Sequence, residues 1–399
     1  MGAVSGPAAG PPAEERRPAR PPRRVRLLRA LRLAGGLLLL ALLLFLPTPI
    51  GRYLLRAAWE EGKILARRRA ITELVADTTV DAATRAKLRL VLAARSFAAD
   101  SVRLRAKESF TQYTRLERDT LVLLLSGAYR DQLKFRSWWF PIVGRVPYKG
   151  YFDFGAAAAA ARALDAEGYD AYLRPASAFS TLGYFNDPLL STTLRLDSLE
   201  LVNTVIHELL HNSFYASGEA VFNESFANFV GSRGAEWFFA SRGAPGAARE
   251  TERRWADERQ LGRFWTAVYA SLDSAFDANP DSRPARLAAR AAIYGRARAE
   301  LRDSIAPRLV TMSPRALART RLDNAALLSR RIYLTDLDLF EAVYERERRD
   351  LRRTIARVIA LAKSRPDEPY EAVRDWVGGV PALAAESEGR GTRSGRGTG

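Results

Sequence analysis

Hydrophobic residues recur at intervals of three or four over much of the chain, which is the spacing of one face of an α-helix. This spacing runs through residues 53–107 and returns after Gly246, so both regions are predicted to be helical. Residues 120–149 differ, because runs of leucine and aromatic residues broken by glycine and proline favour strands. An alanine-rich helix is predicted at 154–167, and alternation at 169–176 predicts a further strand. The pattern therefore predicts an α+β fold that is mostly helical and holds a small sheet.

One apolar pattern predicts a largely buried helix that contains both histidines of the chain. Its apolar positions are Leu199, Val202, Val205, Ile206, Leu209 and Leu210. His207 and His211 are four residues apart, so a helix places both imidazoles on one face. With Glu208 they form HExxH, in which two histidines bind zinc and the glutamate acts as general base. Two randomly placed histidines would fall into this arrangement roughly a few times in ten thousand, so the pattern predicts a zinc site.

A third protein ligand must be a carboxylate, because the chain has no cysteine and no third histidine. The carboxylates within reach downstream are Glu219, Glu224 and Glu236. Glu224 lies on a second apolar pattern at 222–230, whereas Glu219 lies in a glycine-containing turn. We therefore predict that Glu224 joins the two histidines in binding one Zn²⁺ per chain, with Glu219 as the alternative. Asn228, one turn beyond Glu224, is predicted to accept the other ring N–H of His207.

The HExxH helix and the segment Asn223-Glu-Ser-Phe-Ala-Asn228 resemble the gluzincin zinc peptidases. A closer resemblance, to a bacterial family of predicted membrane-associated aminopeptidases, covers most of residues 53–345 and is also carried by segments 146–152, 178–188 and 322–333. The resemblance implies a zincin-like catalytic domain, a zinc cofactor and aminopeptidase activity on peptides. Gluzincins usually have aspartate where this chain has Asn228. Many members of the bacterial family resemble lipoproteins, an anchor that a chain without cysteine cannot carry.

Peptide hydrolysis at such a site needs a base and a hydrogen-bond donor for the developing oxyanion. Glu208 is predicted to take a proton from water and to return it to the leaving amine. Because no further histidine exists, the donor must be a tyrosine, an arginine, an asparagine or a backbone N–H. Tyr333 is the first candidate and Tyr294 the second, and the alternative for each is a core tyrosine with a local hydrogen bond. Tyr148 and Tyr151 are candidates to line the cleft.

The segment before the zinc helix is a candidate edge strand for the substrate. It includes Phe179, Ser180, Thr181 and Tyr184, which follow the predicted strand at 169–176. An extended peptide could pair with the backbone of such an edge. The alternative is a surface loop held by its phenylalanines.

The first 50 residues are predicted to carry a membrane segment. Residues 1–32 hold eight arginines and two glutamates, a local charge of +6, and are predicted to be disordered. Residues 33–50 follow as a transmembrane anchor or as a cleaved signal segment. The fourteen mostly leucine residues from Leu33 to Leu46 span about 21 Å of helix, short of a bilayer core of about 30 Å. The positive-inside rule then places the domain in the periplasm, anchored to the bacterial inner membrane or secreted after cleavage.

Residues 51–380 are predicted to form one domain, with a helical neck at 51–119 and a catalytic core at 120–380, before a disordered tail at 381–399. The formal net charge of +17 does not predict nucleic-acid binding. Six of these charges belong to the N-terminal tail, and most other arginines alternate with acidic residues at helical spacing, which is typical of a solvated face. The sequence gives no indication of the oligomeric state.

A zinc aminopeptidase is the function these patterns favour, and two alternatives stay open. An aminopeptidase needs a carboxylate that holds the free amine of its substrate, and only Asp187 and Glu219 lie nearby in the sequence. A zinc endopeptidase of the same mechanism is therefore one alternative. The other is an inactive membrane-anchored scaffold with a structural or vestigial zinc site. Structural zinc normally takes four protein ligands, so a set of three favours catalysis.

Overall fold

The computed structural model of the protein describes residues 23–120, 122–140, 144–175 and 188–379. Residues 1–61 and 62–399 form two compact units. The first unit contains helix α1 (Arg23–Phe45) and most of helix α2 (Pro49–Ala66). Helix α1 begins inside the segment that was expected to be a disordered tail, so residues 23–32 are helical instead.

The predicted membrane segment at 33–50 is not one continuous helix. Helix α1 ends at Phe45 and α2 begins at Pro49. Pro47, in the turn between them, lacks the N–H that a continuing helix needs. Within the described residues, no helix combines the length and the apolar character needed to cross a membrane. The transmembrane prediction is therefore not supported.

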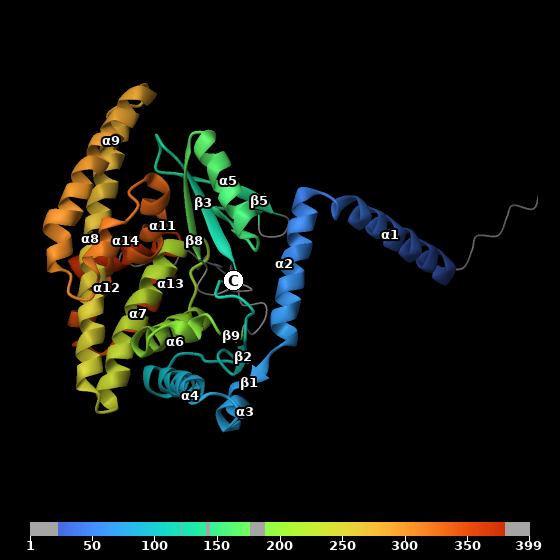
Figure 1. The fold of residues 1–399 in the computed structure, drawn as a ribbon, viewed down its shortest axis with the longest axis horizontal. Helices are drawn as coiled ribbons and strands as arrows, with labels where there is room; N and C mark the ends of the chain where they lie inside the picture. The colour runs from blue at the N-terminus through green and yellow to red at the C-terminus, as the bar shows by residue number, and fades with distance from the viewer. Residues whose placement is uncertain (1–22, 121, 141–143, 176–187, 380–399) are drawn as a thin grey trace, which may run out of the picture. The chain divides into compact units, whose positions relative to one another are not determined.

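A four-stranded antiparallel sheet is the main β structure of the second unit (Figure 1). Its strands are β3 (Leu123–Tyr129), β4 (Phe135–Arg136), β7 (Tyr148–Tyr151) and β8 (Tyr169–Pro175). Strand β3 pairs with the other three, and Leu125 lies opposite Lys149 on one side and Leu173 on the other. Helix α5 (Phe154–Ala166) packs on this sheet. The helix predicted at 154–167 and the strands predicted at 120–149 and 169–176 are confirmed.

Two smaller sheets contain the remaining strands of the described residues. They are made of β1 (Arg69–Ala70), β2 (Gln112–Thr114) and β9 (Leu189–Leu190), and of β5 (Trp138–Phe140) and β6 (Gly144–Val146). Strand β2, from the predicted neck, pairs in parallel with β9, which lies shortly before the helix that carries the histidines. The second part of the neck, from Gly62 on, therefore belongs to the same unit as the predicted core.

Helices make up most of the second unit. The α-helices that follow α2 and α5 in chain order are α3 (Ile71–Ala76), α4 (Ala82–Phe97), α6 (Ser198–Ser213), α7 (Ala220–Ser241), α8 (Pro245–Asp277), α9 (Arg283–Glu300), α10 (Pro314–Ala318), α11 (Asn324–Leu334), α12 (Leu337–Arg346), α13 (Leu351–Ser364) and α14 (Pro369–Gly378). The helical regions predicted at 53–107 and after Gly246 are confirmed. The fold is α+β and mostly helical, as the hydrophobic pattern predicts.

The largest hydrophobic core of the described residues surrounds α6 and α7, which pack against each other. The apolar face predicted for α6 is buried, except that Leu199 is only partly so. Fully buried aromatic rings on α7 contact Phe340 of α12 and Trp255 of α8. Burial of one such ring contributes up to about 3 kcal/mol, so the two helices are held on several sides.

Candidate metal centre

The turn between α6 and α7 is fixed by a single buried asparagine. Gly218 has a φ of +85°, a left-handed conformation that favours glycine in this turn. The side chain of Asn223 accepts from the backbone N of Ala216 at 2.8 Å and donates to the carbonyl of the same residue at 2.7 Å. Since Glu224 is the next residue, this clamp sets its position relative to the end of α6, where His211 lies.

His207, His211 and Glu224 lie close enough together to hold one metal ion. The Nε2 atoms of the two histidines are 3.3 Å apart, and the carboxylate oxygens of Glu224 lie 3.3 Å from His207 Nε2 and 3.6 Å from His211 Nε2. Zinc bonds of about 2.0 to 2.1 Å imply ligand atoms about 3.3 to 3.4 Å apart at the corners of a tetrahedron. The three side chains therefore fit a zinc ion. They are 13, 20 and 26 % exposed, so solvent reaches the site.

Two glycines of α7 allow this approach of the helices. A Cβ at Gly231 would lie 2.2 Å from Oδ1 of Asn203 and 3.1 Å from Cβ of His207. A Cβ at Gly234 would lie 2.8 Å from a methyl carbon of Ile206. Any larger residue at either position would push α7 away from α6. The glycines therefore keep the backbone beside His207 close to the helix that carries Glu224.

The charges around the three side chains suit the binding of a cation. Burial opposes the charged form of Glu224, but hydrogen bonds to His207 and His211 outweigh it and hold its pKa well below the usual range. Burial also opposes protonation of His207, yet the hydrogen bond to Glu224 and the charge of Glu208 raise its pKa. Because a histidine must be neutral to bind zinc, metal binding would displace a proton from this cluster.

Glu208 and Tyr333, the predicted base and oxyanion donor, lie within electrostatic reach of the metal cluster. The charge of Glu208 acts on both His207 and Tyr333. Burial raises the pKa of Tyr333, on α11, and the charge of Glu224 raises it further, so the phenol stays protonated and able to donate. Tyr294, the second candidate, donates instead to Oδ1 of Asn324 at 2.8 Å and is buried. The structure therefore favours Tyr333, which stays a prediction as oxyanion donor.

The predicted residues around the cleft divide into three groups. Tyr148 lies within the electrostatic reach of Glu224. Tyr151 packs against the core of the sheet, and the Lys149 ammonium lies 5.2 Å from its ring centroid. The edge residues Phe179, Ser180, Thr181 and Tyr184 lie outside the described residues, as does Asp187.

The hydrogen bond predicted between His207 and Asn228 is not present among the described contacts. The side-chain amide of Asn228 donates to Glu258 at 3.0 Å and to the carbonyl of Tyr333 at 3.4 Å. The contacts of the amide nitrogen therefore run to α8 and α11, and the sequence pattern of α7 does not show these neighbours. Burial, together with the charge of Glu200, raises the pKa of Glu258 to about 7. A protonated Glu258 and an ionised Glu258 are therefore both accessible near neutral pH.

The raised pKa of Glu258 should make the stability of the folded protein fall as the pH rises, and Glu258→Gln should remove this dependence. In the metal-free folded protein Glu258 binds a proton up to about pH 7, whereas its ordinary pKa is 4.5. Its stabilising contribution is therefore full below pH 4.5 and is lost as the pH rises through 7, an effect on the order of a few kcal/mol. We expect Glu258→Gln to keep the thermal midpoint near its low-pH value at pH 8, where the wild type loses stability. The exposed control Glu252→Gln should behave as the wild type, and equal pH dependence in all three proteins would contradict the assignment.

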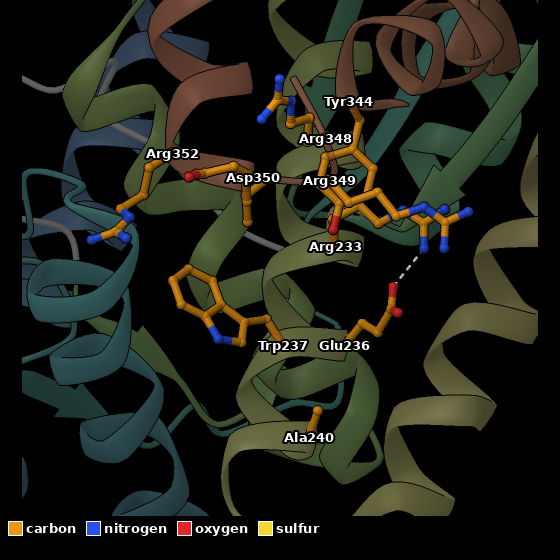
Figure 2. Close-up of a pocket in the computed structure, with 10 residues that line it drawn as sticks. Arg233, Glu236, Trp237, Ala240, Tyr344, Arg348, Arg349, Asp350 and Arg352 are labelled. Atoms are coloured by element: carbon orange, nitrogen blue, oxygen red, sulfur yellow. Dashed lines mark hydrogen bonds and ion pairs between the residues drawn. The ribbon is translucent and has the colours of Figure 1, made fainter. Parts of the chain in front are cut away.

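The other two carboxylates considered as ligands do not join the cluster. Among the described residues, the group with the spacing of a metal site consists of His207, His211 and Glu224 alone. Glu219 precedes α7 and Glu236 bonds to Arg233 at 2.5 Å. Figure 2 shows this pair in a cavity of about 420 Å³, lined also by Trp237 and Tyr344. None of the residues that line this cavity belongs to the metal cluster.

Two charged residues near the cluster were missed by the sequence interpretation. Glu258 comes from α8, within reach of His207, and Arg174 comes from the end of β8, within reach of Tyr333 and Tyr148. Both reach the site through tertiary packing. The available signal for Arg174 was weak, since it consisted of a cation at the end of a predicted strand just before the candidate substrate edge.

Comparison with known proteins gives one match. A family model described as "Putative aminopeptidase" matches residues 52–373, which include the metal cluster, Glu208 and Tyr333. No curated protein and no solved structure matches the chain.

Proposed function

The chain belongs to this putative aminopeptidase family, and we propose that it hydrolyses peptide bonds with a zinc ion held by His207, His211 and Glu224 in a zincin-like domain. The observation that carries the proposal is the spacing of 3.3, 3.3 and 3.6 Å between the three ligand groups, which fits three corners of a zinc tetrahedron. Three protein ligands leave one position for a reactant, as catalytic zinc sites require. An inactive scaffold has no comparable support.

The residues around the metal have separate roles in this proposal. Zinc, when bound, supplies a Lewis acid that makes water more acidic and polarises a carbonyl group. Glu208 accepts the proton of the attacking water and later delivers it to the leaving amine. Tyr333 donates its hydroxyl hydrogen to the oxygen on which negative charge develops. Asn228 positions Tyr333 by donating to its backbone carbonyl, and it also contacts Glu258.

The test is a digest of a peptide library by the full-length zinc-loaded protein, with and without a chelator. We expect cleavage that stops with the chelator and returns with added zinc. Loss of single N-terminal residues would support an aminopeptidase, whereas internal cleavage would indicate the endopeptidase alternative. Absence of any zinc-dependent cleavage across the library would contradict the proposal.

Location outside the cytoplasm is a separate proposal, supported by the eight arginines that precede the apolar residues 33–50. We expect a reporter that works only in the periplasm to be active when fused after residue 380. Activity of the matched cytoplasmic reporter instead would contradict this location. Cleavage of a signal segment would appear as a shorter mature chain by mass spectrometry.

A further inference from the structure

Arg174 is a partly buried cation that has no anionic partner among the described residues. It is the sixth residue of β8, opposite Leu124 of β3. Its guanidinium carbon lies 6.0 Å from the ring centroid of Tyr333, and its Nε atom is buried without a hydrogen-bond partner. No described carboxylate lies within ion-pair distance of it, whereas Arg290, for example, is paired with Asp170. A buried unpaired guanidinium is costly unless something else supplies the negative charge.

Tyr333 links this cation to the candidate metal centre: its ring faces the Arg174 guanidinium, and its backbone carbonyl accepts from Asn228, one turn beyond Glu224 on α7, at 3.4 Å. Arg174 and Glu224 both act on the hydroxyl of Tyr333, and they act on that of Tyr148 as well. Burial raises the pKa of both tyrosines, the charge of Glu224 raises it further, and the charge of Arg174 lowers it. The guanidinium, two phenol groups and a proposed zinc ligand therefore share one region. Tyr148 is 39 % exposed, so a substrate can reach this region from solvent.

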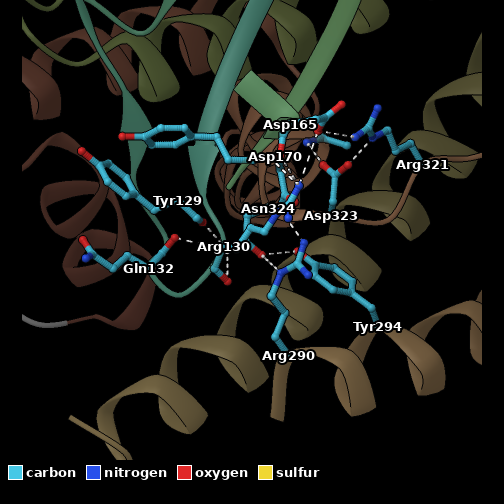
Figure 3. Close-up of polar contacts among 12 residues, drawn as sticks. Tyr129, Arg130, Gln132, Asp165, Asp170, Arg290, Tyr294, Arg321, Asp323 and Asn324 are labelled. Carbon is cyan, nitrogen blue, oxygen red and sulfur yellow. Dashed lines mark hydrogen bonds and ion pairs between the residues drawn. The ribbon is translucent and has the colours of Figure 1, made fainter. Parts of the chain in front are cut away.

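A polar network joins the opposite ends of the strand and the helix that carry Arg174 and Tyr333 (Figure 3). Asp170, the second residue of β8, accepts from the backbone N of Asn324 at 2.9 Å and from Arg290 at 2.5 Å. Asn324 begins α11, is fully buried and donates to the carbonyl of Tyr129 at 2.8 Å. The starts of β8 and α11 are thus joined, and Arg174 and Tyr333 lie near their ends. A cation held by a rigid scaffold binds an anion with little loss of entropy.

We propose that Arg174 binds the C-terminal carboxylate of a short peptide substrate, so that the site prefers peptides with a free C-terminus close to the scissile bond. A guanidinium offers two parallel N–H groups that match the two oxygens of a carboxylate. The hydroxyls of Tyr148 and Tyr333 lie within the electrostatic reach of Arg174 and can donate to the same group or to the carbonyl beside it. The proposal rests on the peptide hydrolysis proposed above, and it adds the substrate class.

The experiment compares three peptides that carry a carboxylate at the C-terminus, no carboxylate, or a carboxylate on the last side chain. They are Leu-Ala-Ala as the free acid, the same peptide as its C-terminal amide, and Leu-Ala-Asp amide. For the full-length zinc-loaded wild type we expect kcat/KM to be about 10- to 100-fold higher for the acid than for either amide, the usual contribution of a charged hydrogen bond. In Arg174→Gln the ratio of acid to amide should fall to about one, and Arg174→Lys should retain part of it. The exposed control Arg249→Gln should keep the wild-type ratio.

Each contrary result has a defined meaning. A wild-type ratio near one overturns the proposal without any variant, and equal cleavage of Leu-Ala-Asp amide and the free acid overturns the assignment to the C-terminus. An Arg174→Gln protein that loses rate on all peptides at an unchanged ratio also overturns it, because Arg174 would then act on the oxyanion or on the fold. If no peptide is cleaved, the proposed function has failed. The role of Arg174 is then tested separately by calorimetry, which measures the affinities of the Glu208→Gln protein for the acid and amide tripeptides. Equal affinities there would overturn the role of Arg174.

Discussion

Glu208→Gln should leave the zinc content and the thermal midpoint near their wild-type values while peptide hydrolysis falls by about 10² to 10⁴, the usual contribution of a positioned general base. Glutamine keeps the size of the side chain but cannot accept the proton of water. Glu208 is not among the three side chains with ligand spacing, so the metal should stay bound. Metal analysis, thermal unfolding and a peptide assay on the same preparation check the three parts of this result.

The control for Glu208→Gln is Glu252→Gln, which changes an exposed glutamate of α8 in the same chemical way. It should leave zinc content, stability and rate unchanged. Full activity of Glu208→Gln towards a peptide that the chelated protein cannot cleave would show that another group acts as the base.

Glu224→Ala should remove both zinc and activity, whereas Glu219→Ala should retain zinc. Glu224 contacts both histidines, at 3.3 and 3.6 Å, and Glu219 lies before α7 without joining the cluster. Loss of a direct ligand should weaken zinc binding by more than about 100-fold, the upper range for residues that only orient a ligand. Competition with a zinc-binding dye measures the affinity. Equal zinc loss in the two variants would contradict Glu224 as the ligand.

The clustering of His207, His211 and Glu224 was predictable because most of it is local in sequence. The positions of His207 and His211 follow from one turn of a helix, and the apolar residues of α6 show which face is buried. Glu224 lies thirteen residues beyond His211, on the next helix, and the lack of cysteine and further histidine left a carboxylate as the third ligand. At Gly231 and Gly234, α7 packs closely against α6, and the hydrophobic pattern of the sequence alone does not show this contact.

The residues that the sequence interpretation missed or misplaced depend on distant elements. The partner of Asn228 is Glu258, thirty residues later on α8, and the environment of Tyr333 includes Arg174, on a strand. Tyr294 has the side chain expected of an oxyanion donor, but its hydroxyl donates to Asn324, thirty residues away. Hydrophobic periodicity reports which face of an element is buried, and it does not report which polar side chains meet there.

The helices and strands were predictable because they follow from local sequence patterns. Their arrangement was not, because it depends on contacts between distant segments. Alternation along β8 and the helical spacing of α6 are local properties. The pairing of β2 with β9 joins residues 113 and 189, and no local pattern indicates it. At the N-terminus, leucine content predicted a spanning segment at 33–50, whereas the helix ends at Phe45, just before the turn that contains Pro47.

Diffraction from crystals of the zinc-loaded protein, measured at the zinc absorption edge, tests the central claim most directly. We expect one anomalous peak per chain between His207, His211 and Glu224, with these three protein ligands and no fourth residue bound to the metal. A peak elsewhere, no peak at this cluster, or a fourth side chain that closes the site would contradict a catalytic zinc centre in this protein.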